Sequence, residues 1–192
     1  MPRPSLKHQR VAQILDAYEN CVARYGVAGA TLERIAAEAG LARPLIRHNV
    51  GNRDDLLEAL TNRFLEKSEQ SMQEMMDYMP GENRGEYLVA CLFDEEFEDS
   101  KTVMVANALI SAAPEHPKLA ERLTLWVEGF IDSIAGELAR CYAGADEEAV
   151  YAAATGITGI YFNVDSLSAV GNPQRLRAAS KQAALVLLDS LK

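Results

Sequence analysis

The spacing of apolar residues is the feature that most constrains the fold of this chain. From residue 5 to residue 25, apolar side chains recur every three or four positions, at Val11, Ile14, Leu15, Tyr18, Cys21, Val22 and Tyr25. This period aligns them along one face of an amphipathic helix. Similar stripes follow, and no segment shows the strict alternation of a half-buried strand. The chain is therefore predicted to be all-α, with about nine helices.

Glycine and proline divide these stripes into separate helices. Gly26, Gly40, Gly51 and Pro80 are the expected stops in the first part of the chain, since glycine commonly ends a helix and proline cannot continue one. The expected helices span residues 5–25, 31–39, 42–50, 53–79, 86–97, 101–113, 118–142, 146–169 and 173–191.

The segment from residue 31 to residue 50 is typical of a helix-turn-helix. Thr31 is a good N-cap, Gly40 suits the turn, and Pro44 fits only the first turn of a second short helix. In such a unit the second helix can enter the major groove of DNA. Arg43 and Arg47 lie four residues apart on one face of it. Two short helices that cap a bundle and carry surface arginines remain the alternative.

Charge is distributed unevenly along the 192 residues. Residues 1–53 hold eight Lys and Arg against four Asp and Glu, whereas the remainder holds 11 against 24. A basic N-terminal part can approach a polyanion that repels the acidic remainder. The overall net charge of −9 therefore does not argue against nucleic acid as a partner.

The stretch GVAGATLERIAAEAGLARPLIRHNVGNRDDLLEAL resembles the DNA-binding domain of the TetR family of transcriptional regulators. The matching positions are Gly26, Thr31, Ile35-Ala36, Ala39-Gly40, Arg47-His48, Gly51-Asn52 and Arg53-Asp54-Asp55-Leu56, and the match covers about residues 8–68. The resemblance implies a three-helix DNA-binding head at residues 1–52. It also implies a C-terminal helical bundle for ligand binding and dimerisation at residues 53–192.

The resemblance also implies roles for residues of the head. The residues expected to contact phosphates are Thr31, Arg47, His48 and Arg53, and those expected nearest the bases are Arg43, Pro44 and Leu45. The chain departs from the family pattern at Ala42, Arg47, Asn49 and Val50, where a capping Ser or Thr, a Tyr and an aromatic pair are usual. These departures bear on the operator sequence and not on the fold.

The C-terminal part is expected to bind a largely apolar small-molecule inducer and a second copy of the chain. The candidate ligand residues are Phe93, Met104, Asn107, Trp126, Phe130, Tyr161, Phe162 and Asp165. Small and apolar residues on the last two helices suggest a homodimer interface at Gly156, Gly159, Leu185 and Leu188. For each of these residues, ordinary core packing is the competing interpretation.

The sequence indicates a regulator rather than an enzyme. The three histidines are scattered, no phosphate-binding loop or metal-ligand spacing occurs, and neither a cofactor nor a metal is expected. The three widely spaced cysteines, and the lack of a signal peptide or membrane-length apolar run, favour the cytoplasm. The most consistent function is a repressor that an inducer releases from a palindromic operator in double-stranded DNA. The alternative is a helical ligand-binding or protein-interaction protein that does not bind DNA.

Overall fold

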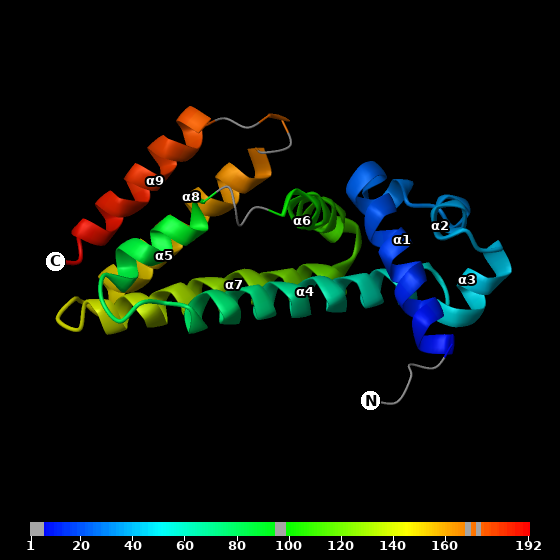
Figure 1. Ribbon diagram of the computed structural model, residues 1–192, viewed down its shortest axis with the longest axis horizontal. Coiled ribbons are helices and arrows are strands. Elements are labelled where there is room, and N and C mark those ends of the chain that lie inside the picture. Colours follow the sequence, from blue (N-terminus) through cyan, green and yellow to red (C-terminus); the bar gives the residue numbers. More distant parts are fainter. Residues whose placement is uncertain (1–5, 95–98, 168–169, 172–173) are drawn as a thin grey trace. The chain divides into compact units, whose positions relative to one another are not determined.

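The computed structural model describes residues 6–94, 99–167, 170–171 and 174–192. Within these ranges the regular elements are helices, which confirms the predicted all-α class (Figure 1). The α-helices of the described residues are α1 (Leu6–Gly29), α2 (Leu32–Ala39), α3 (Arg43–Val50), α4 (Arg53–Asp77), α5 (Arg84–Leu92), α6 (Ser100–Ala112), α7 (Pro117–Cys141), α8 (Glu147–Leu167) and α9 (Gln174–Asp189).

Most of the predicted helix boundaries fall within about two residues of the observed ones. The helix expected at 86–97 is an exception, since α5 ends at Leu92 and residues 95–98 lie outside the described part of the chain. The predicted stop at Gly26 corresponds to a break inside α1. Gly26 has φ 68°, a left-handed conformation that favours glycine, and a short helical turn then continues to Gly29.

The chain falls into two compact units. The first extends to Ser68 and includes Lys101–Leu123, and the second comprises Glu69–Ser100 and Thr124–Lys192. The boundary expected after residue 52 therefore lies inside the first unit. The reason is that α4 and α6 both contact α1 through charged side chains. The Glu19 carboxylate of α1 lies 3.4 Å from Nε of Arg63 and 3.3 Å from Nζ of Lys101.

In the first unit, α1, α2 and α3 pack against one another (Figure 1). Apolar side chains that face inward from these helices and from the start of α4 are almost fully buried. They include Ile14, Tyr18, Val22, Ile35, Ile46, Leu56 and Leu60. Their spacing along α1 follows the stripe that the sequence predicts. Burial of this stripe drives the three short helices together, since helices of eight residues are not stable in isolation.

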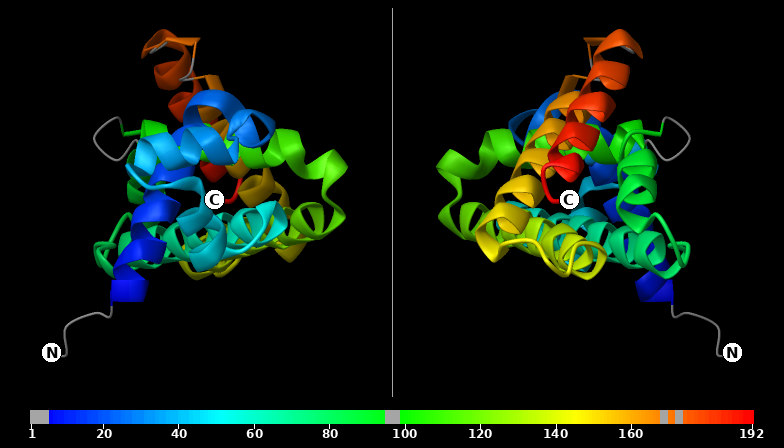
Figure 2. Two further views of the ribbon diagram at one scale, coloured as in Figure 1. Left: turned by 90° about the vertical axis from the view of Figure 1, so that its right-hand side faces the viewer. Right: turned by 90° about the vertical axis from the view of Figure 1, so that its left-hand side faces the viewer.

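In the second unit, α9 packs on both α8 and α5 (Figures 1 and 2). Buried aliphatic residues of four helices form its core, among them Leu88, Val89, Ile134, Leu138, Ile157 and Leu188. Gly156 lies where a Cβ atom would come 2.8 Å from Cδ1 of Leu187. The small residue therefore permits the close approach of α8 and α9.

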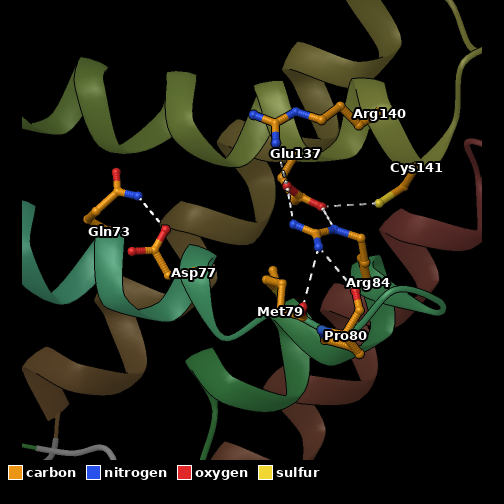
Figure 3. Close-up of polar contacts among 8 residues, drawn as sticks. All are labelled: Gln73, Asp77, Met79, Pro80, Arg84, Glu137, Arg140 and Cys141. Atoms are coloured by element: carbon orange, nitrogen blue, oxygen red, sulfur yellow. Dashed lines mark hydrogen bonds and ion pairs between the residues drawn. The ribbon is translucent and has the colours of Figure 1, made fainter.

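A buried ion pair ties α5 to α7 within the second unit (Figure 3). The Arg84 guanidinium donates to both carboxylate oxygens of Glu137, over 2.5 and 3.1 Å, and a further nitrogen donates to the Pro80 carbonyl over 3.1 Å. The Glu137 side chain is only 1% exposed. Hydrogen bonds from Arg84 hold the pKa of Glu137 below its usual range, although burial acts in the opposite direction.

We expect Glu137→Gln to lower the free energy of unfolding at pH 7 by about 1–3 kcal/mol, because a charged, two-pronged contact becomes a neutral one. The folded-state pKa of Glu137 is depressed, so its contribution is complete above the unfolded-state pKa of about 4.3. That contribution is lost as the pH falls through the folded-state pKa. Urea unfolding at fixed protein concentration should therefore show the two proteins converging between about pH 5 and pH 3. Glu121→Gln, an exposed site on the same helix, is the control. If the difference in free energy of unfolding between the wild-type chain and Glu137→Gln does not change with pH, this account is contradicted.

Candidate nucleic-acid interface

The turn between α2 and α3 is fixed by local signals in the sequence. The Thr31 hydroxyl caps α2 by accepting a hydrogen bond from the Arg34 amide over 3.3 Å. At the other end Gly40 adopts φ 62°, and its amide and that of Leu41 donate to carbonyls of the last helical turn over 3.2 and 3.0 Å. The predicted cap and the predicted glycine turn are both confirmed.

Helix α3 exposes nearly all of its side chains. Ile46 is its one buried residue and is 0% exposed. Pro44 sits in the first turn as expected, and Ala42 at the N-cap makes no side-chain hydrogen bond. Five of the residues predicted to contact DNA are exposed on this helix, namely Arg43, Pro44, Leu45, Arg47 and His48. The other two lie at helix starts, where Thr31 is half-buried and Arg53 is exposed. Helix α3 thus presents two arginines, a histidine and an apolar side chain outward.

The two arginines of α3 differ in their surroundings. Arg43 forms an ion pair with Glu33, in the first turn of α2, and both side chains stay 60% exposed. Hydrogen bonds from its own backbone amide and from Thr31 hold the pKa of Glu33 below its usual range, and Arg43 contributes in the same direction. Arg47 forms no ion pair with any carboxylate of the described residues. The sequence analysis did not predict the ion pair between Glu33 and Arg43.

Arg53 has a structural contact that the sequence did not predict. One of its guanidinium nitrogens donates to the carbonyls of Val27 and Ala28, over 2.9 and 3.0 Å. This contact ties the start of α4 to the end of α1. Nearby, the Asn52 side chain caps α4, and Asp55 accepts a hydrogen bond from the Asn52 amide over 2.8 Å. The NxxD spacing is the signal that could have predicted this reciprocal cap.

The predicted ligand residues do not all come together. Five aromatic side chains of the second unit form one cluster, in which Trp126 stacks on Phe162 at 5.1 Å between ring centroids and Phe130 stacks on Tyr161 at 5.8 Å. Phe93 meets the edge of this cluster, 6.2 Å from Tyr161. Met104 and Asn107 belong to the first unit, and Asp165 lies on α8.

The predicted dimer residues are likewise divided. Gly156 and Gly159 line an open groove of about 500 Å³ between α8 and α9, with Thr155, Ile160, Asn163, Ala179, Ser180 and Ala183 as the other lining residues. Leu188 is 1% exposed and belongs to the unit's own core, so it cannot reach a partner in this arrangement. Leu185 is half-buried against the same core, whereas Val186 is 59% exposed.

The described ranges hold neither a cluster of metal ligands nor a helix that could span a membrane. No group of three or more His, Cys, Asp or Glu residues there is arranged to hold a metal ion. None of the helices in these ranges has the length and apolar character that a membrane crossing requires.

A capped helix, a glycine turn and an exposed arginine-bearing helix define the first unit as a helix-turn-helix domain. The family described as "Bacterial regulatory proteins, tetR family" matches residues 14–60, a segment that begins within α1, contains α2 and α3 and ends within α4. This part of the chain is similar to the DNA-binding domain of TetR-family regulators.

Curated transcriptional regulators are similar to part of the chain. The chain is 28% identical to the HTH-type transcriptional regulator BetI of Paraburkholderia phytofirmans over 121 residues, which make up 62% of each protein. It is 35% identical to the HTH-type transcriptional repressor AcnR of Corynebacterium jeikeium over 69 residues, covering 36% of this chain and 33% of AcnR. The matched region thus spans less than two thirds of these relatives.

The fold is shared along nearly the whole chain. A TetR transcription regulator from Haloarcula marismortui superposes with a TM-score of 0.77 at 18% identity, over 95% of this chain and 98% of that one. A TetR-family member from Streptomyces coelicolor superposes with a TM-score of 0.66 at 20% identity, over 93% and 98%. Both similarities concern the fold alone.

The contacts of Arg53 and Arg43 predict different effects on stability. Arg53→Ala removes two charged hydrogen bonds to carbonyls and should lower the free energy of unfolding by about 1–2 kcal/mol. Arg43→Ala removes only an exposed ion pair and should change the free energy of unfolding by less than about 1 kcal/mol. Urea unfolding of the full chain at one concentration measures both. Equal losses in the two variants would contradict the structural role of Arg53.

Proposed function

We propose that the chain is a transcriptional repressor that binds a palindromic DNA operator as a homodimer and is released by a small molecule. One observation carries this proposal: α3 buries only Ile46 and exposes Arg43, Pro44, Leu45, Arg47 and His48. The name of AcnR, a transcriptional repressor, supports repression over activation. The proposal includes a cytoplasmic location, since that is where a bacterial chromosome lies.

The geometry of the head supports a division of labour among its residues. In a helix-turn-helix the first residues of the second helix lie nearest the base edges. We infer base contacts for Arg43, Pro44 and Leu45, of which only the arginine can form a two-pronged hydrogen bond with guanine. Phosphate contacts are proposed for Arg47 and His48 in the later part of α3.

Two further phosphate contacts are proposed at helix starts. Thr31 caps α2, whose free backbone amides and dipole favour an anion. Arg53 begins α4 and is exposed, so its guanidinium can contact a phosphate with the donors that Val27 and Ala28 do not occupy. In this proposal Arg53 has two functions: it fixes the α1–α4 contact and adds positive charge beside the duplex.

A palindromic operator requires two heads, about 34–36 Å apart for half-sites one turn apart. The groove between α8 and α9 supports a dimer through these helices, because its small lining residues let a partner helix approach closely. Val186 and Tyr151 add apolar surface, and they are 59% and 48% exposed. Gly156, Gly159 and the half-buried Leu185 remain in the proposed interface, whereas Leu188 does not.

The aromatic cluster supports the proposed inducer site. Trp126, Phe130, Tyr161 and Phe162 are each half-buried, so their ring faces and edges can contribute to an apolar binding surface. A ligand that binds more tightly to one spacing of the two heads would shift the dimer away from the spacing that fits the operator. The proposed inducer is therefore largely apolar.

Selection of genomic fragments by the purified chain, followed by gel shifts, tests DNA binding. Arg43→Ala should reduce the free energy that discriminates between base pairs by about 1–3 kcal/mol at one position of each half-site. Arg53→Ala should weaken binding to all DNA sequences by the same factor. It should also reduce the slope of log affinity against log salt concentration by the amount expected for about one phosphate contact. Identical behaviour of the two variants would contradict the division of roles. If the wild-type chain selects no sequence, the alternative of a helical ligand-binding or protein-interaction protein replaces the repressor.

Sedimentation at micromolar concentration tests the dimer. The wild-type chain should have twice the 21.0 kDa mass of one copy. Val186→Glu should shift it towards one copy and weaken operator binding, because a carboxylate would be buried against an apolar partner surface. Leu125→Glu is the matched control, since Leu125 is 62% exposed and lies on α7 away from the groove. A monomeric wild-type chain, or equal effects of the two substitutions, would refute this interface.

A further inference from the structure

Glu33 and Arg43 connect the two helices of the helix-turn-helix on their exposed side. Arg43 is the first residue of α3, and its guanidinium forms an ion pair with the Glu33 carboxylate in the first turn of α2. The backbone amide of Glu33 and the Thr31 hydroxyl lower the pKa of the Glu33 carboxyl, so both favour its charged form. The ion pair therefore links a charged carboxylate in the first turn of α2 to the first residue of α3.

Stability does not explain this pair. Both side chains are 60% exposed, and an ion pair so accessible to water adds little to the folded state. The core of the first unit does not need it either, because Ile46 anchors α3 without its help. The remaining effect of the ion pair is on the orientation of the Arg43 side chain.

Orientation matters because an arginine side chain is flexible. A guanidinium that is already fixed loses less rotamer freedom when it binds, so preorganisation increases affinity for the correct base. When a duplex displaces water from this surface, the local dielectric falls and the attraction between Glu33 and Arg43 increases. The carboxylate would also repel any phosphate that came close to it.

We propose that Glu33 is a positioning residue that sets base specificity by aiming Arg43 at a base edge and away from the phosphates. This inference rests on the proposed DNA-binding function. It assigns Glu33 two effects of opposite sign. Glu33 improves discrimination at the base that Arg43 reads, and it weakens binding to DNA of unrelated sequence through its negative charge.

The test begins with an operator selected by the wild-type chain. Arg43→Ala identifies the base pair at which discrimination depends on Arg43. At that base pair Glu33→Gln should reduce discrimination about five- to tenfold, which corresponds to about 0.9–1.4 kcal/mol. The same substitution should tighten binding to unrelated DNA about twofold, because a charge that faces the phosphates is removed.

A double-mutant cycle separates positioning from a general structural effect. In the Arg43→Ala background, Glu33→Gln should not change discrimination at that base pair. Glu38→Gln is the matched control, since it makes the same charge change on α2 but its carboxylate pairs with Arg24 of α1 over 3.2 Å. Glu38→Gln should leave discrimination at the Arg43 base pair unchanged. Thermal unfolding of each variant checks that the head remains folded.

Three outcomes would overturn the inference. Discrimination that is unchanged or improved in Glu33→Gln would mean that Glu33 does not aim Arg43, or sequesters it from DNA. A loss that persists in the Arg43→Ala background would mean that Glu33 acts by another route. An equal loss in Glu38→Gln would indicate a general effect of charge. Failure of the wild-type chain to select any sequence would instead refute the proposed function, so the two failures are distinguishable.

Discussion

The burial of one side chain, Ile46, determines what the first unit can present to a partner. It is the only residue of α3 that is inaccessible to solvent, and it packs among the inward-facing residues of α1, α2 and the start of α4. A helix of eight residues with no side-chain N-cap would not persist in water by itself. Because Ile46 is the only fully buried residue of α3, five of the helix's eight residues stay exposed. The exposed arginines are therefore a consequence of how little of α3 is buried.

The helix-turn-helix was predictable because its determinants are local. Thr31, Gly40 and Pro44 each fix a backbone position through their own side chain or through the lack of one, so their effect can be read from sequence spacing. The contacts of Arg53 and Arg43 were not predictable in the same way. Each depends on where a long side chain meets groups that are distant in sequence. Arg53 reaches carbonyls 25 and 26 residues away.

The C-terminal helices show a different limit of sequence reasoning. Their extents followed from Gly and Pro breaks, but the faces that they bury did not, because the segment from Ala183 to Leu188 is apolar on most sides. The structure resolves this ambiguity, since Ala184 and Leu188 enter the core while Val186 remains exposed. The division into compact units also depends on contacts that are distant in sequence. Charged contacts of α1 with α4 and α6 join segments that are far apart in the sequence.

A comparison of two Arg–Glu pairs, Arg84 with Glu137 and Arg43 with Glu33, shows how the environment determines what an ion pair can do. Arg84 and Glu137 meet where the carboxylate is almost fully buried, so separating them would strand a charge in a medium of low polarity. Such a pair fixes the packing of α5 on α7 and has little freedom to respond to a ligand. Arg43 and Glu33 are joined by the same chemistry at the surface, where water supports either partner alone. Separation of Arg43 from Glu33 therefore costs little free energy. The strength of this ion pair depends on whether water or a partner molecule covers it. A duplex that excludes water there would convert a weak contact into a strong one, which is the behaviour expected of a group that positions a side chain only when the partner is bound.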